Sequence, residues 1–265
     1  MVTTQDRTIP AWRRQVNTNV KIAGGGPPAV FLHGAFGLQW DGFLDSLAQT
    51  NTVYAPEHPG TTPDAPEDVA HLDGVWDLVL CYDELLEALG VGRAAFVGHS
   101  FGGMVACELA AAYPARAERL ALIDPIGFWR DSDRIVNWML MDPSQLRRQL
   151  FRDPDGDAAR TLFGAPGDAE ATVAARVRLT WAMGTTGKFI WPLPDKGLKK
   201  RIHRVKAPTL VLWGKDDRLV PPVYADEFTR RLPDTRVQMV DGAGHAPHLE
   251  QPEVVARMVR DFLGR

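Results

Sequence analysis

Ser100 has the sequence surroundings that are typical of a serine nucleophile. It stands at the centre of a Gly-x-Ser-x-Gly pattern over residues 98–102, between an apolar run at 94–97 and helix-forming residues at 104–110. On such a turn between a strand and a helix, the serine takes a strained conformation and its hydroxyl is exposed above the sheet. The glycines remove side chains that would collide with the adjoining strand and helix. Because the short pattern also arises by chance, the interpretation depends on whether the chain supplies partners for the hydroxyl.

A histidine after the last apolar run could be the base that Ser100 needs. A serine hydroxyl is a poor nucleophile at neutral pH unless a base takes its proton, and the base needs an orienting acid. In open α/β sheets such groups gather at the carboxyl ends of the strands. His245 meets this condition, because it lies in a glycine-rich loop after the expected strand at 236–240. His33 also follows a strand, but its glycine neighbour indicates a support for a turn, and His99 is expected to pack behind the serine.

Four aspartates could orient this histidine. Asp216 and Asp217 both follow the apolar run at 207–213, and Asp124 follows an earlier apolar run. Asp241 lies only four residues before the histidine, and we consider it too local to be favoured. Spacing alone does not separate Asp216 from Asp217.

Two backbone amides are expected to hold the oxyanion of a tetrahedral intermediate. The serine turn itself positions the amide of Phe101, the residue after the nucleophile. The second amide should come from the loop after the apolar strand at 29–32, where Ala35 and Phe36 are the candidates and Ala35 is favoured. Glycines at 34 and 37 allow this loop to approach closely.

The elements that must position these residues follow an α/β rhythm. Short apolar strands alternate with helical patterns over residues 29–124 and again over 207–263. This alternation predicts a mostly parallel sheet with helices on both faces. Between 125 and 204 no buried strand is evident, and helices are expected at 131–140 and 169–183. The change of texture predicts a helical insertion over one end of the sheet.

The composition excludes several other classes of protein. The 265 residues are 45% hydrophobic and 24% charged, which is enough apolar material for a sizeable core. The formal net charge of −3 argues against a nucleic-acid-binding protein. Cys81 and Cys107 fall in helical, partly apolar patterns and are expected to be core residues rather than a disulfide or a metal pair. We expect no secretion signal, no membrane span and a cytoplasmic location.

The sequence resembles the α/β-hydrolase superfamily in four segments. These are residues 32–37, 98–103, 213–221 and 244–245, which occur in the family's order of nucleophile, acid and histidine. The resemblance implies an eight-stranded, mostly parallel sheet in a core domain of residues 1–124 and 205–265. It also implies that residues 125–204 form a helical cap over the substrate pocket.

The resemblance also implies which aspartate is the acid. In the family pattern Trp-Gly-x-x-Asp-x-x-x-Pro the acid is Asp217, and Asp216 occupies a variable position. Asp124 matches an acid position that a minority of relatives use, so it remains an alternative.

The function implied by the resemblance is a serine hydrolase with Ser100, His245 and Asp217 as a catalytic triad. We expect it to cleave a small to medium, partly apolar ester through an acyl-enzyme, without metal or organic cofactor. The expected partner is a small-molecule substrate, and the oligomeric state stays open. Aromatic residues of the cap and of the oxyanion loop are candidates for the pocket lining: Phe36, Trp129, Trp138, Trp181 and Trp191.

Three alternatives remain on the same scaffold. A hydrolase of carbon–carbon bonds would keep the serine, although relatives of that kind often carry Trp after the histidine, where this chain has Ala246 and Pro247. A cofactor-free haloperoxidase is not separated from an esterase by sequence. A non-catalytic protein that binds a small ligand could also retain the same residues.

Overall fold

An eight-stranded sheet forms the centre of the computed structural model, which describes residues 2–62, 65–164 and 169–264. The strand order is β1-β2-β4-β3-β5-β6-β7-β8. The first pairings, β1 with β2 and β2 with β4, are antiparallel, and all the others are parallel. This confirms the predicted eight-stranded, mostly parallel sheet. The strands are β1 (Gln5–Ala11), β2 (Val16–Ala23), β3 (Pro28–Leu32), β4 (Thr52–Pro56), β5 (Ala94–His99), β6 (Ala117–Ile123), β7 (Thr209–Gly214) and β8 (Thr235–Val240).

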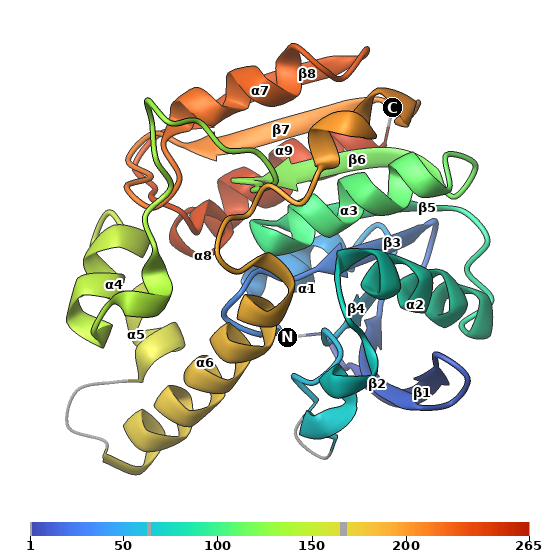
Figure 1. The fold of residues 1–265 in the computed structure, drawn as a ribbon, viewed down its shortest axis with the longest axis horizontal. Helices are drawn as coiled ribbons and strands as arrows, with labels where there is room; N and C mark the ends of the chain where they lie inside the picture. Colours follow the sequence, from blue (N-terminus) through green and yellow to red (C-terminus); the bar gives the residue numbers. More distant parts are fainter. Residues whose placement is uncertain (1, 63–64, 165–168, 265) are drawn as a thin grey trace.

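The central strands β3, β5 and β7 are buried and largely apolar, as expected where helices cover both faces of a sheet (Figure 1). Successive side chains of β3 alternate between two cores: Val30 and Leu32 belong to one, and Ala29 and Phe31 belong to the other. Helices α2 (Val75–Ala88) and α3 (Phe101–Ala112) cover the first face. Helices α1 (Gly42–Leu47) and α9 (Pro252–Leu263) cover the second.

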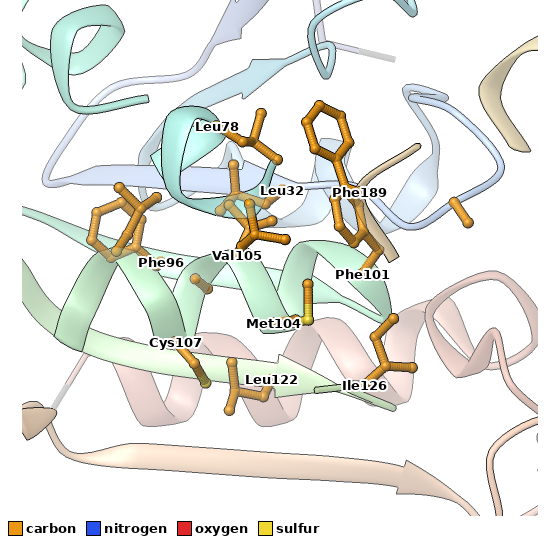
Figure 2. Close-up of a cluster of buried hydrophobic side chains, with 14 of the residues drawn as sticks. Leu32, Leu78, Phe96, Phe101, Met104, Val105, Cys107, Leu122, Ile126 and Phe189 are labelled. Carbon is orange, nitrogen blue, oxygen red and sulfur yellow. The ribbon is translucent and has the colours of Figure 1, made fainter. Parts of the chain in front are cut away.

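The larger core lies between the sheet and helices α2 and α3, and part of it is drawn in Figure 2. Leu32, Phe96 and Leu122 come from three neighbouring parallel strands and pack there against the helices. Cys107 on α3 belongs to this core, as does Cys81 on α2, and both are buried free thiols. Burial raises the pKa of the Cys81 thiol to about 12. The prediction that both cysteines are core residues is confirmed.

Residues 125–204, referred to below as the insertion, contain helices and no strand in their described part. The helices are η2 (Trp138–Leu140), α4 (Pro143–Leu150), α5 (Asp157–Phe163), α6 (Ala169–Ile190), η3 (Leu198–Lys200) and η4 (Ile202–Arg204). In Figure 1, α4, α5 and α6 gather on the side toward which the arrowheads of β6 and β7 point.

The prediction of a helix at residues 131–140 in the insertion is wrong. Residues 131–140 form bends and coil, and only the last three make a short 3-10 turn. The backbone amide of Val136 donates to the carbonyl of Leu219 (3.1 Å) instead of closing a helical turn. The helix that does form, α4, starts at a capping box of Asp142 and Gln145, a signal that the sequence carries. The helix expected at 169–183 is present and extends to Ile190.

An ion pair, a ring stack and a hydrogen bond from the Arg204 side chain to the carbonyl of Ala111 (2.8 Å) attach the end of the insertion to α3. The guanidinium of Arg201 donates to both carboxylate oxygens of Glu108 (2.7 and 2.6 Å), and Glu108 is almost fully buried. The ring of Phe189 stacks on that of Phe101 at the start of α3, with centroids 6.1 Å apart.

The remaining elements are short helices outside the insertion. The 3-10 helix η1 (Pro66–His71) precedes α2, and η5 (Pro222–Tyr224), α7 (Ala225–Thr229) and α8 (Pro247–Glu250) complete the fold. None of the described helices is long and apolar enough to cross a membrane.

Candidate active site

Ser100 occupies a strained turn between β5 and α3. Its φ of 52° and ψ of −113° lie outside the backbone conformations that residues other than glycine ordinarily adopt. The glycines of the motif are required by close packing: a Cβ added to Gly102 would collide with the carbonyl of Leu32 on the neighbouring strand. A Cβ added to Gly98 would lie 2.5 Å from the carbonyl of Gly102. The local sequence therefore fixes where the serine stands at the carboxyl end of the sheet.

Ser100, His245 and Asp217 form a continuous chain of hydrogen bonds. The Ser100 hydroxyl lies 2.9 Å from Nε2 of His245, and Nδ1 of the same ring lies 2.7 Å from a carboxylate oxygen of Asp217. All three residues are buried. A carboxylate only accepts, so Nδ1 carries the proton and Nε2 is left as an acceptor for the serine hydroxyl. This is the tautomer that a general base requires.

The Asp217 carboxylate is held by the backbone as well as by the imidazole. Its Oδ1 accepts the amides of Leu219 and Val220, both at 2.9 Å. Asp216 instead lies at the surface, 41% exposed, and its carboxylate pairs with Arg152 at 3.3 Å. The two adjacent aspartates thus differ completely in environment, although their spacing in the sequence is equivalent.

Asp124 lies beside this chain at the end of β6. It is fully buried, and Gly214 donates its amide to Oδ1 at 2.9 Å. One ligand-type atom from each of Asp124, Asp217 and His245 lies within 4.8 Å of the others. These residue types can bind metals, but the imidazole Nδ1 and both Asp217 oxygens are already engaged in hydrogen bonds, so we interpret the group as a hydrogen-bonded cluster.

The loop after β3 passes directly over the serine. A Cβ added to Gly34 would lie 2.6 Å from Nδ1 of His99 and 3.3 Å from Cβ of Ser100, so a side chain at this position would displace the His99 ring. Ala35 and Phe36, which follow it, are buried, as is Phe101. Phe36 lines a small cavity of about 30 Å³ behind this loop.

Neutral histidines support the loop from below. His33 donates Nδ1–H to the carbonyl of Gly34 (2.7 Å) and accepts the amide of His58 at Nε2 (2.9 Å). His58 in turn donates to the carbonyl of His33 (2.8 Å) and bonds the Tyr82 hydroxyl at Nδ1 (2.5 Å). Burial lowers the pKa of His33 to about 4 and that of His58 well below its ordinary value. The sequence had suggested a supporting role for His33 but gave no sign that His58 is its partner.

Sequence comparison identifies the family. A sequence model described as the Alpha/beta hydrolase family matches residues 29–258, most of the chain. The chain belongs to the alpha/beta hydrolase family. Two similar curated proteins are 2-hydroxy-6-oxo-6-phenylhexa-2,4-dienoate hydrolase of Burkholderia cepacia and pimeloyl-[acyl-carrier protein] methyl ester esterase of Nitrosomonas europaea. The first is 26% identical over 99% of this chain and 95% of its own length, and the second is 29% identical over 89% and 95%.

Solved structures share the same fold. Naproxen esterase from Bacillus subtilis superposes with a TM-score of 0.75 at 18% identity, covering 99% of this chain and 92% of its own. The meta-cleavage product hydrolase CumD superposes with a TM-score of 0.74 at 20% identity, covering 97% of each chain. The similar proteins include hydrolases of esters and of carbon–carbon bonds, so the comparisons show the family and do not distinguish between these two reactions.

The four candidate tryptophans of this alpha/beta hydrolase lie in different surroundings. Trp181 is half exposed and donates its indole N–H to the carbonyl of Gly60 (2.6 Å). Trp129 and the buried Trp138 line a cavity of about 130 Å³ within the insertion. Trp191 is half exposed, at the end of α6. The structure therefore does not gather the four around one cavity.

A larger groove opens beside the loop after β3. It has a volume of about 590 Å³ and is bordered by Gly37 and Leu38 of that loop, by Thr61, and by Val177 and Trp181 of α6. Ala182 of α6 lies against the loop after β3, since a Cβ added to Gly37 would lie 3.5 Å from the methyl group of Ala182. The residues that line the groove are mainly apolar and come from the insertion and from the segments after β3 and β4.

Glu250 and Leu150 hold the His245 loop and were not recognised in the sequence. The backbone amide of His245 donates to the carbonyl of Leu150, the last residue of α4 (2.7 Å). Glu250 accepts the amide of Gly244 at 2.6 Å and that of Arg152 at 2.8 Å. The bonds from His245 to Leu150 and from Arg152 to Glu250 join segments far apart in the chain, and no local motif signals them.

Proposed function

We propose that this alpha/beta hydrolase is a serine hydrolase that cleaves esters through an acyl-enzyme. The observation that carries the proposal is the hydrogen-bonded chain from Ser100 through His245 to Asp217. Because Nε2 of His245 is the free acceptor, it can take the serine proton as Oγ attacks the substrate carbonyl. The same nitrogen then gives the proton to the leaving alcohol, and Asp217 stabilises the imidazolium that exists between the two transfers.

The second half of the reaction repeats these roles with water. His245 would take a proton from water as its oxygen attacks the acyl carbon, and would return the proton to Ser100 Oγ as the acid product leaves. In both halves the carbonyl oxygen becomes an oxyanion. We assign its stabilisation to the backbone amides of Ala35 and Phe101, and the close approach of Gly34 to Ser100 supports this assignment.

We infer that the substrate is a small to medium ester with an apolar part. The mainly apolar groove beside Gly37 favours such a substrate, and the esterases among the similar proteins agree with it. On this proposal the insertion acts as a cap whose helix α6 forms one wall of the groove. Trp181 is the tryptophan best supported as a contact, because it borders this groove. The two free buried cysteines agree with a reducing compartment such as the cytoplasm.

Hydrolysis of a carbon–carbon bond is a second candidate for the same nucleophile. The observation in its favour is the presence of 2-hydroxy-6-oxo-6-phenylhexa-2,4-dienoate hydrolase among the similar proteins. Its leaving group is a carbon atom, which must receive the proton that an ester would place on oxygen. The two candidates therefore differ in the substrate and share the serine, the base and the acid.

The proposal is tested by labelling and turnover of matched variants. A fluorophosphonate should label the wild type on Ser100 and should not label Ser100→Ala, while Ser144→Ala, altered at an exposed serine, should label normally. Wild-type protein is then assayed on a panel of nitrophenyl esters and on a ring-fission dienoate. Ester turnover supports the main proposal and dienoate turnover alone supports the second. Labelling without any turnover would indicate a ligand-binding protein, and full ester turnover by Ser100→Ala would refute the mechanism.

A further inference from the structure

The carboxyl group of Asp124 has one oxygen that no donor reaches among the described residues. The amide of Gly214 donates to Oδ1, whereas Oδ2 is buried and accepts no hydrogen bond from the described residues. A buried ionised carboxylate with an unpartnered oxygen is costly, since it has lost water and gained nothing in return. Asp124 is not needed for the chain of bonds from Ser100 to Asp217, so its burial beside that chain requires its own explanation.

The ionisable neighbours of Asp124 leave no free donor for its second oxygen. His245 uses Nδ1–H for Asp217, and the amides of Leu219 and Val220 also point to Asp217. Asp217 comes from the loop after β7, His245 from the loop after β8, and Glu250 of α8 adds a third carboxyl nearby. Among these groups the nearest suitable acceptor for a proton on Asp124 is the Asp217 carboxylate.

Two buried carboxyl groups at this separation do not both ionise, because like charges in a low dielectric repel strongly. Asp217 accepts three hydrogen bonds and is the better place for the charge. Burial and the neighbouring Asp217 raise the pKa of Asp124 well above its ordinary value. The positive φ of Asp124 (44°) suits an Asp or Asn residue, and it turns the chain away at the end of β6.

We propose that Asp124 is a positioning residue that stays protonated at neutral pH and donates its carboxyl proton to Asp217. This rests on the proposed serine hydrolase function. The added bond is a fourth hydrogen bond to the Asp217 carboxylate, beside those from the two amides and the imidazole, and it helps to keep the imidazole aligned with Ser100. With one proton between them, the carboxyl groups of Asp124 and Asp217 together carry one negative charge rather than two. His245 therefore interacts with a single negative charge.

The kinetic test compares Asp124→Asn with Asp124→Ala. An Asn side chain can accept from Gly214, donate an amide N–H to Asp217 and adopt the same backbone conformation. Asp124→Asn should therefore keep kcat within about threefold of wild type and leave the acid limb of the pH–rate profile where it was. Asp124→Ala removes a hydrogen bond to a charged group and should lower kcat roughly 10- to 100-fold with little change in KM.

Two kinetic outcomes would overturn the proposal. If Asp124 carried a charge, Asp124→Asn would remove that charge from the neighbourhood of His245 and move the acid limb about one pH unit or more downward. If Asp124→Ala matched wild type in kcat and in pH profile, Asp124 would have no positioning role.

An infrared measurement tests the proton itself and does not depend on turnover. The difference spectrum of wild type minus Asp124→Asn at about pH 7 should contain the C=O band of a protonated carboxylic acid. A carboxylate difference band in its place would refute the proposal. The spectrum gives the same information if the protein hydrolyses no ester or if Asp124→Ala does not fold, so failure of the proposed function is distinguished from failure of this inference.

Discussion

Acidification should destabilise this protein strongly, because four histidines are buried as neutral rings. Burial lowers the pKa of His33 to about 4 and of His248 to about 3, and it lowers those of His58 and His99 well below the ordinary value. In the unfolded chain these residues take up protons near pH 6.5, whereas the folded protein keeps them neutral. Their contribution to stability is thus fully present above about pH 6.5 and is lost as the pH falls toward the folded values.

The size of the loss follows from proton linkage. Each histidine that stays neutral lowers the free energy of unfolding by about 2 kcal/mol between about pH 7 and pH 5. Four carboxyls act in the opposite direction, because burial raises the pKa of Asp41 to about 6 and raises those of Asp124, Glu57 and Glu250 above their ordinary values. These groups bind protons more readily in the folded state, so they gain stability as the pH falls. The net loss is therefore smaller than the sum of the four histidine contributions.

The assay is urea denaturation followed by tryptophan fluorescence at several pH values between about 7 and 5. The informative variant is His248→Leu, since His248 packs against Phe31 and Phe43 and its Nδ1 has no described partner. Its pH-dependent loss should be about 2 kcal/mol smaller than that of wild type, whatever its stability at pH 7. His203→Leu, at an exposed position, is the matched control and should keep the wild-type slope. An unchanged slope in His248→Leu would refute the reasoning.

Three further outcomes are expected. Glu108→Gln should lower the free energy of unfolding by about 1–3 kcal/mol in urea denaturation, because it breaks an ion pair whose carboxylate is buried and whose guanidinium is partly exposed, while the exposed Glu118→Gln should not. Glu250→Ala frees the amide of Gly244 and should reduce kcat about tenfold in an ester assay; a change confined to KM would contradict this. Trp181→Phe loses the bond to the chain at Gly60 and should raise KM several-fold for bulky esters but not for acetate esters; equal effects on both would contradict a place in the groove.

The sequence was sufficient to predict the sheet and to nominate Ser100 and His245, because each follows a short apolar strand. Residues in such positions meet at one edge of a parallel sheet whatever the rest of the chain does. The choice between Asp216 and Asp217 could not be made from spacing, since adjacent residues follow the same strand. It depends on which side chain turns inward, and the amides of Leu219 and Val220 fix that in three dimensions.

Contacts between distant segments were beyond the sequence argument. The pairing of His33 with His58 joins the loops after β3 and β4, and neither loop has a pattern that names the other. The expected helix at 131–140 failed for the same reason, because Val136 satisfies its backbone amide on Leu219 rather than locally. Periodicity predicts what a segment can form alone, and these segments are shaped by partners elsewhere.

Hydrogen bonds join the insertion to the loop that carries His245, the proposed general base. The carbonyl of Leu150 in α4 accepts the backbone amide of His245, and Glu250 bonds the amides of Gly244 and Arg152 on the two sides of the same junction. A rearrangement of α4 would therefore also shift the imidazole of His245 relative to Ser100. Because hydrogen-bonded proton transfer depends on distances of a few tenths of an ångström, such a change would lower kcat together with any change in KM. New substrate preferences should arise more readily from α6, whose residues border the groove and, among the described contacts, make no hydrogen bond to the His245 loop.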